Sequence, residues 1–129
     1  EKICFRESWS VRILKESMES FWNLFLVIQE GEKLIGYGTA CVIAGEGEIQ
    51  RIAILPEFRQ KGLGRELLAA LVKTAKERGA RSVTLEVRES NLPARRLYIS
   101  AGFQEEGRRK DYYRNPKEDA IIMWDRELS

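Results

Sequence analysis

The feature that most constrains the fold is a strand, a glycine-containing loop, a helix and a second strand in succession across residues 46–88. The branched run "EIQRIAIL" predicts the first strand, and "RQKGLGR" is the loop. Beyond the loop, apolar residues recur on one helical face, and Gly79 stands at the usual C-terminal position of a helix. The second strand, "RSVTLEVR", alternates apolar and polar residues. A unit of this kind requires its two strands to lie parallel in one sheet.

The segments on either side extend this sheet. "FWNLFLVIQ", "LIGYGTACVI" and "EIQRIAIL" are joined by short Gly-containing turns, which predicts an antiparallel meander. A short helix is expected over residues 10–20 with Ser10 as its N-cap, and a second from the N-cap Asn91 to Gly102. Two further strands are expected around "FQEEGRRKDYY" and "AIIMWDREL". We therefore expect an α/β (α+β) fold in a single domain, residues 1–129, with a mixed central sheet of about six to seven strands flanked by helices.

The composition excludes several kinds of chemistry. The chain has no histidine, which removes Ser-His and Cys-His nucleophilic systems and most zinc and iron sites. Cys4 and Cys41 form no metal or disulfide pattern, so we expect no metal and a location in the reducing cytoplasm. The net charge of +2 gives no general attraction to nucleic acid. No apolar run approaches the roughly 20 residues that span a membrane.

Gly62 and Gly64 lie where a strand gives way to a helix, which is typical of a loop that binds phosphate. Glycine lets backbone N–H groups approach a ligand, and the free N–H groups of a helix N-terminus attract anions. The loop lacks the Gly-Lys-Ser/Thr of a Walker A motif and, with Leu67 in place, the third glycine of a dinucleotide-binding motif. The pattern Arg59-x-x-Gly62-x-Gly64 remains, with a purely structural turn as the alternative.

The wider pattern "IAILPEFRQKGLG … LEVRESNLPARRLYISAGF" resembles the core of the GNAT superfamily of N-acetyltransferases. With the continuation "GRRKDYY … EDAIIMW", it is most similar to the RimI family of ribosomal-protein-alanine N-acetyltransferases, from Ile49 to Met123. The resemblance implies acetyl-CoA as the donor and the N-terminal amine of a protein, an alanine of a ribosomal protein, as the acceptor. The first strand of the family has no counterpart at the start of this sequence, so we expect the sheet to lack it.

The same resemblance implies roles for individual residues. The pantetheine arm and the acetyl carbonyl would be bound by the backbone of Ile52, Ala53 and Ile54. The pyrophosphate would be bound by Arg59, Gln60, Lys61, Gly62, Leu63, Gly64 and Arg65. Asn91 would contact the cofactor, Glu86 would be the general base and Tyr98 the general acid. Tyr112 and Tyr113, expected in a hairpin loop, would orient the acceptor peptide.

The chemistry of acetyl transfer fits these residue types. An α-amino group has a pKa of about 7.7–8.0, so a nearby carboxylate such as Glu86 can take its proton. A tyrosine hydroxyl, with a pKa of about 10, can protonate the leaving thiolate. Neither cysteine has a base partner suited to a covalent intermediate, so direct transfer in a ternary complex is predicted. The structural alternatives are an ion-paired strand carboxylate for Glu86, a core hydroxyl for Tyr98, and strand packing for the paired tyrosines.

The acceptor is less well defined by the sequence than the donor. One alternative is an acetyltransferase of the same fold that acts on a lysine side chain or on a small amine such as a polyamine. Another is an acyl-CoA-binding domain that regulates without turnover.

Overall fold

The computed structural model describes residues 2–4, 9–13, 23–59 and 62–126, with the first two ranges described as backbone only. Within them the chain forms one sheet of eight strands in the order β1-β2-β3-β4-β5-β6-β8-β7. The strands are β1 (Lys2–Cys4), β2 (Trp9–Ile13), β3 (Asn23–Glu30), β4 (Lys33–Ile43), β5 (Glu46–Ile54), β6 (Ser82–Arg88), β7 (Gln104–Tyr113) and β8 (Glu118–Asp125). The helices are the 3₁₀ turn η2 (Pro56–Phe58), α1 (Leu63–Glu77) and α2 (Leu92–Ser100). The mixed α/β sheet flanked by helices is confirmed, and β1 and β2 bring its strand count above the expected six to seven.

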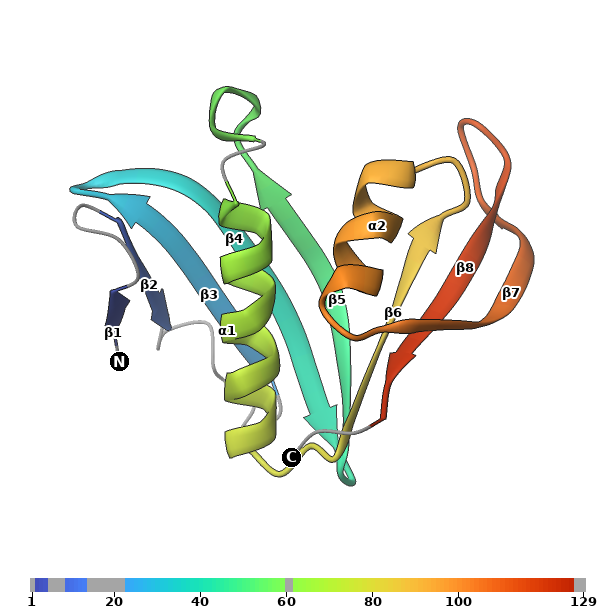
Figure 1. Cartoon of the computed structure of the whole chain (residues 1–129), viewed down its shortest axis with the longest axis horizontal. Helices are drawn as coiled ribbons and strands as arrows, with labels where there is room; N and C mark the ends of the chain where they lie inside the picture. The colour runs from blue at the N-terminus through green and yellow to red at the C-terminus, as the bar shows by residue number, and fades with distance from the viewer. Residues whose placement is uncertain (1, 5–8, 14–22, 60–61, 127–129) are drawn as a thin grey trace.

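The predicted strand–helix–strand unit is confirmed, with β5 and β6 parallel and α1 between them in sequence. The antiparallel meander of β3, β4 and β5 is confirmed as well. In Figure 1, α1 and α2 lie on the same side of the sheet. The core between this layer and the sheet contains Leu67 and Leu71 of α1, which are fully buried against strand residues such as Ile28 and Leu85.

Gly38 of β4 is a point of close contact between the sheet and α1. A Cβ atom at this position would lie 2.6 Å from Cδ1 of Leu71, whose side chain is fully buried. Glycine is therefore required for the helix to pack at this depth.

The helix expected over residues 10–20 is wrong in the part that the structure describes. Trp9–Ile13 is the strand β2, which pairs antiparallel with β3, while residues 14–20 lie outside the described ranges. The segment "WSVRI" alternates apolar and polar residues, a period of two that favours a strand. The unpaired edge of β3 supplies its backbone partner.

The C-terminal half follows the prediction more closely. The Oδ1 atom of Asn91 accepts a hydrogen bond from Ala94 N at 3.2 Å, so Asn91 is the N-cap of α2. Gly102, with φ of +104°, ends that helix in the left-handed region. β8 then pairs antiparallel with both β6 and β7. No helix within the described residues is both long and apolar enough to cross a bilayer.

Candidate active site

β5 and β6 separate partway along their length. Their parallel pairing ends at Ile49 opposite Leu85, although β5 continues to Ile54 and β6 to Arg88. On its other side β5 has a bulge, because Ala40 of β4 faces Ile49 and Thr39 faces Arg51, which leaves Gln50 as an extra residue. A bulge bends its strand, and here it stands where the two parallel strands part (Figure 1).

The opening between the two strands contains a cavity of about 260 Å³. It brings together five residues that the sequence predicted for the site: Ile52, Glu86, Asn91, Tyr98 and Tyr113. These residues come from β5, β6, α2 and its N-cap, and the end of β7, which are spread over more than sixty positions of the sequence. Convergence of that kind in a concave place is what a small-molecule site requires.

Residues 52–54 lie beyond the parallel pairing and have β4 as their only strand partner among the described residues, with Gly38 opposite Ile52 and Gly36 opposite Ile54. In an antiparallel pair, alternate residues direct their N–H and C=O groups to the partner strand. Part of this backbone therefore faces the opening. Ala53 and Ile54 do not line this cavity but a different, apolar cavity of about 300 Å³, so the predicted role would fall to the backbone of these residues.

The glycine loop leads into α1 through a left-handed residue. Gly62 has φ of +80° and is the N-cap, and the first helical hydrogen bond runs from Glu66 N to Gly62 O. The N–H groups of Leu63, Gly64 and Arg65 thus precede the helical ladder and are available to an anion. The Leu63 side chain is buried in the core, so this residue offers only its backbone. Gln60 and Lys61 lie outside the described residues.

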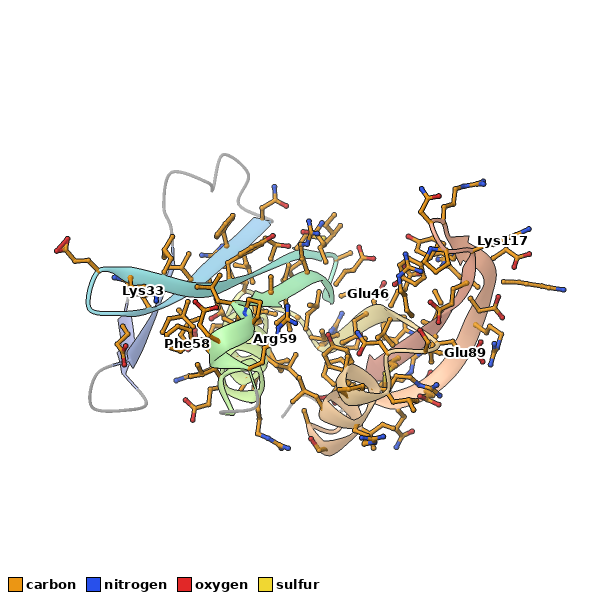
Figure 2. The ribbon with its side chains drawn as sticks, turned by 90° about the horizontal axis from the view of Figure 1, so that it is seen from above. Lys33, Glu46, Phe58, Arg59, Glu89 and Lys117 are labelled. Atoms are coloured by element: carbon orange, nitrogen blue, oxygen red, sulfur yellow. The ribbon has the colours of Figure 1, made fainter. Side chains whose placement is uncertain are left out.

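The segment before the glycine loop is fixed at two points. The Nε of Arg59 donates to the Ile54 carbonyl oxygen at 3.1 Å, which ties the loop to the end of β5. The Lys33 Nζ lies 5.0 Å from the centre of the Phe58 ring, so η2 also contacts the start of β4 (Figure 2). The start of α1 lies close to α2, since a Cβ atom at Gly64 would be 3.6 Å from Cδ2 of Leu97.

Glu86 stands on β6 between Leu85 and Val87, which are both buried in the core on the helix side. Its side chain therefore points to the opposite face of the sheet. There it forms an ion pair with Nε of Arg109 from β7. The negative charge of Glu86, followed by a hydrogen bond to Glu86, raises the pKa of Tyr112.

Tyr98 projects from α2 into the cavity between β5 and β6. Its ring lies 6.1 Å from the ring of Phe103, which is fully buried. Burial, followed by the influence of Tyr113, raises the pKa of the Tyr98 hydroxyl. The group is therefore a protonated phenol throughout the neutral pH range.

Another cavity of about 300 Å³, which we call the second cavity, lies on the face of the sheet that Glu86 reaches. It is distinct from the apolar cavity at Ala53 and Ile54. Its lining includes Glu48, Glu86, Tyr112 and Tyr113. The two tyrosines are the last residues of β7, and the turn begins after them, so the expected hairpin-loop placement is wrong. The register of β7 against β8 shifts between Arg109 and Tyr113, which carries both rings to the cavity, 5.1 Å apart and edge to face.

Three residues near these cavities were not among the site residues predicted from the sequence. Arg109 pairs with Glu86, Arg88 stacks on Tyr113, and Glu48 lines the second cavity. For Glu48 a signal was available, because in "GEIQRIAI" it precedes the apolar Ile49 and so belongs on the same face as Glu86. Among the described residues, no group of three or more Cys, Asp or Glu side chains is placed to hold a metal ion.

Comparisons with known proteins identify the family to which the chain belongs. Residues 1–103 match the Acetyltransferase (GNAT) family. The [ribosomal protein bS18]-alanine N-acetyltransferase of Haemophilus influenzae is 40% identical over 119 residues, which cover 89% of this chain and 80% of the relative.

Two solved structures are similar to the chain. The crystal structure of the ribosomal-protein-S18-alanine N-acetyltransferase of Escherichia coli is similar with a TM-score of 0.78 and 33% identity, over 88% of this chain and 76% of that one. A GNAT family acetyltransferase from Elizabethkingia anophelis, with acetyl-CoA bound, shares the fold with a TM-score of 0.80 at 18% identity, over 95% of this chain and 100% of that one. The chain belongs to the GNAT family of acetyltransferases.

Proposed function

We propose that this protein transfers an acetyl group from acetyl-CoA to the N-terminal α-amino group of a protein, an alanine of a ribosomal protein. The observation that carries the proposal is the opening between β5 and β6, where Glu86, Asn91 and Tyr98 meet in one cavity beside the end of β5 that pairs with β4 alone. The identity of 40% with an enzyme named for this reaction supports the choice of acceptor. Because ribosomal proteins are made in the cytoplasm, we place the reaction there.

The residues present fit acetyl-CoA, which supplies an activated acetyl thioester. The N–H groups of Leu63, Gly64 and Arg65 would hold the pyrophosphate at the start of α1, where the helix dipole also favours negative charge. Arg59, Gln60 and Lys61 would complete this contact from the loop. The backbone of residues 52–54 would bind the pantetheine arm, with Asn91 as a further contact. Because the Asn91 Oδ1 atom caps α2, its side-chain NH₂ group remains as the donor.

Glu86 is the proposed general base. The acceptor amine has a pKa of about 7.7–8.0 and arrives largely as the ammonium at neutral pH. In the unliganded chain the Glu86 carboxylate is already paired with Arg109. The incoming ammonium therefore competes with the guanidinium for the same oxygen atoms before it transfers its proton.

Tyr98 is the proposed general acid. Burial keeps its pKa above the ordinary value, so the phenol retains its proton until the thiolate leaves. Burial, followed by the charge of Glu48, raises the pKa of the Cys41 thiol, which disfavours the thiolate that a covalent intermediate would need. This supports direct transfer. Tyr112 and Tyr113 would orient the acceptor backbone at the second cavity.

The test is turnover with a panel of acceptors, followed as release of free thiol from acetyl-CoA. We expect turnover with peptides that begin with alanine and none with the same peptides carrying a blocked α-amine. Turnover confined to polyamines or to internal lysines would replace the proposed acceptor. Binding of acetyl-CoA without turnover on any amine would indicate a regulatory domain.

A further inference from the structure

Two carboxylates line the second cavity, and they differ in their partners. Glu86 forms an ion pair with Arg109, so a cation already lies beside its carboxylate. The Glu48 side chain is exposed and, among the described residues, makes no ion pair or hydrogen bond; only the backbone of Glu48 is paired, with Cys41 and Thr84. Among the described residues that line this cavity, Glu48 is therefore the only acidic side chain without a positively charged partner.

The position of Glu48 follows from the sheet. It precedes Ile49, which packs in the core, so its side chain points to the face opposite α1, the face to which Glu86 also points. In the register of β5 and β6, Glu48 lies opposite Thr84, two residues before Glu86 on the same face. The cavity they share is continuous in its lining with the cavity that contains Tyr98, through Ile49, Gln50, Glu86 and Tyr113.

An acceptor amine has to pass from solvent into this opening as a cation. A carboxylate already paired with arginine attracts it less than an unpaired carboxylate at the same cavity does. We infer that Glu48 binds the α-ammonium group of the acceptor and delivers it to Glu86. This role rests on the proposed function, and it makes Glu48 a residue of acceptor affinity and specificity, not of proton transfer.

The experiment compares Glu48→Gln with Glu46→Gln. Glu46 is exposed on the same strand and the same face, two residues further from the opening, and serves as the matched control (Figure 2). A short peptide amide that begins with alanine and has no charged side chains is titrated calorimetrically into each protein saturated with coenzyme A. At pH 7 we expect Glu48→Gln to weaken peptide binding about tenfold and Glu46→Gln to leave it within about twofold.

The pH dependence identifies the group that Glu48 binds. At about pH 9 the α-amine is neutral, so we expect the difference between Glu48→Gln and the wild-type chain to disappear. The other titratable groups near Glu48 are Cys41, Glu86, Tyr112 and Tyr113, and they are the same in all three proteins. Equal affinities at pH 7, or a tenfold difference that persists at pH 9, would overturn the inference.

The titration contains no acetyl donor and so does not depend on turnover. If the wild-type chain fails to acetylate the peptide, the proposed function is wrong, while the effect of Glu48→Gln on binding still decides the role of Glu48. If turnover is seen, Glu48→Gln should raise the KM for the peptide about tenfold at pH 7 and leave kcat and the KM for acetyl-CoA unchanged.

Discussion

The guanidinium of Arg88 lies over the ring of Tyr113, with its central carbon 4.4 Å from the ring centre. The same side chain donates hydrogen bonds to the carbonyl oxygens of Arg114 and Pro116, at 3.1 and 3.0 Å, and to Glu118 at 3.2 Å. Arg88 thus joins the end of β6 to the turn between β7 and β8. In doing so it fixes Tyr113, which lines both the cavity between β5 and β6 and the second cavity.

Replacing Arg88 by lysine should loosen Tyr113 without unfolding the chain. Lysine keeps the charge but lacks the planar fork that reaches three acceptors at once. Because each lost contact contributes about 0.5–1.5 kcal/mol, we expect the KM for an alanine-starting peptide to rise about threefold to tenfold. The affinity for acetyl-CoA, measured by calorimetry, should stay unchanged.

Arg126→Lys is the matched control for this substitution. Arg126 also stacks on an aromatic ring, with its guanidinium carbon 4.1 Å from the ring centre of Trp124, and it pairs with Glu106. It lines neither the cavity between β5 and β6 nor the second cavity. We expect no change in KM for this variant. Equal effects of the two substitutions would mean that Arg88 contributes to stability alone.

Local patterns of the sequence predicted the strand–helix–strand unit, because the apolar face of α1 and the alternation in β6 span enough residues to be unambiguous. The helix prediction is wrong at Trp9–Ile13, because the alternation there spans only five residues and the deciding factor is the open edge of β3. The pairing of Glu86 with Arg109 was not predictable either. These residues are 23 positions apart on strands separated by β8, and the irregular register of β7 brings them together.

Replacing Glu86 by glutamine should lower the pKa of Tyr112. The carboxylate raises that pKa because it opposes formation of a second negative charge beside it. Neutral glutamine removes the opposition, so the pKa should fall toward the ordinary value of about 10. An ultraviolet titration of phenolate formation measures the change, and Tyr112→Phe identifies the transition. Glu105→Gln, which alters a carboxylate of β7 paired with Arg95, should leave this titration as it is.

The same Glu86→Gln variant tests the proposed base. Glutamine cannot accept the proton of the acceptor ammonium, so at pH 7 we expect kcat to fall by about 10²-fold or more. The loss should shrink as the pH rises above the amine pKa of about 8, where the acceptor is already neutral. Glu89→Gln, at an exposed carboxylate paired with Arg108, should have wild-type kcat. Wild-type turnover of Glu86→Gln at pH 7 would remove Glu86 from the reaction.

Removing the Tyr98 hydroxyl should slow departure of the thiolate. We expect Tyr98→Phe to lower kcat by about 10²-fold while acetyl-CoA affinity stays within about twofold. Because burial raises the Tyr98 pKa, the wild-type rate should show no loss from Tyr98 ionisation below about pH 10. Tyr37→Phe, on β4 at the apolar cavity, is the control and should be neutral.

A donor with a better leaving group distinguishes acid catalysis by Tyr98 from packing. An acetyl thioester of an aromatic thiol releases a thiolate that needs no proton, so Tyr98→Phe should use this donor nearly as well as the wild-type chain does. An equal defect with both donors would assign Tyr98 a packing role.

Gly36→Ala should disturb the end of β5 that we propose as the pantetheine site. A Cβ atom at this position would lie 2.4 Å from the Ala53 carbonyl oxygen and 3.2 Å from the Ile54 Cα. Because both are backbone atoms, β4 and β5 must move apart, which should lower the free energy of unfolding by about 1–3 kcal/mol in a urea titration. The affinity for acetyl-CoA should fall in parallel, since Ile54 also accepts the hydrogen bond from Arg59.

Gly107→Ala provides the control for Gly36→Ala, because its Cβ would meet Ile122 Cδ1 at an ordinary 3.5 Å. We expect it to change the free energy of unfolding by no more than about 0.5 kcal/mol and to bind acetyl-CoA normally. If Gly36→Ala lowers stability as expected but binds acetyl-CoA with wild-type affinity, the backbone of residues 52–54 is not part of the donor site. The pantetheine arm would then have to bind elsewhere in the opening between β5 and β6.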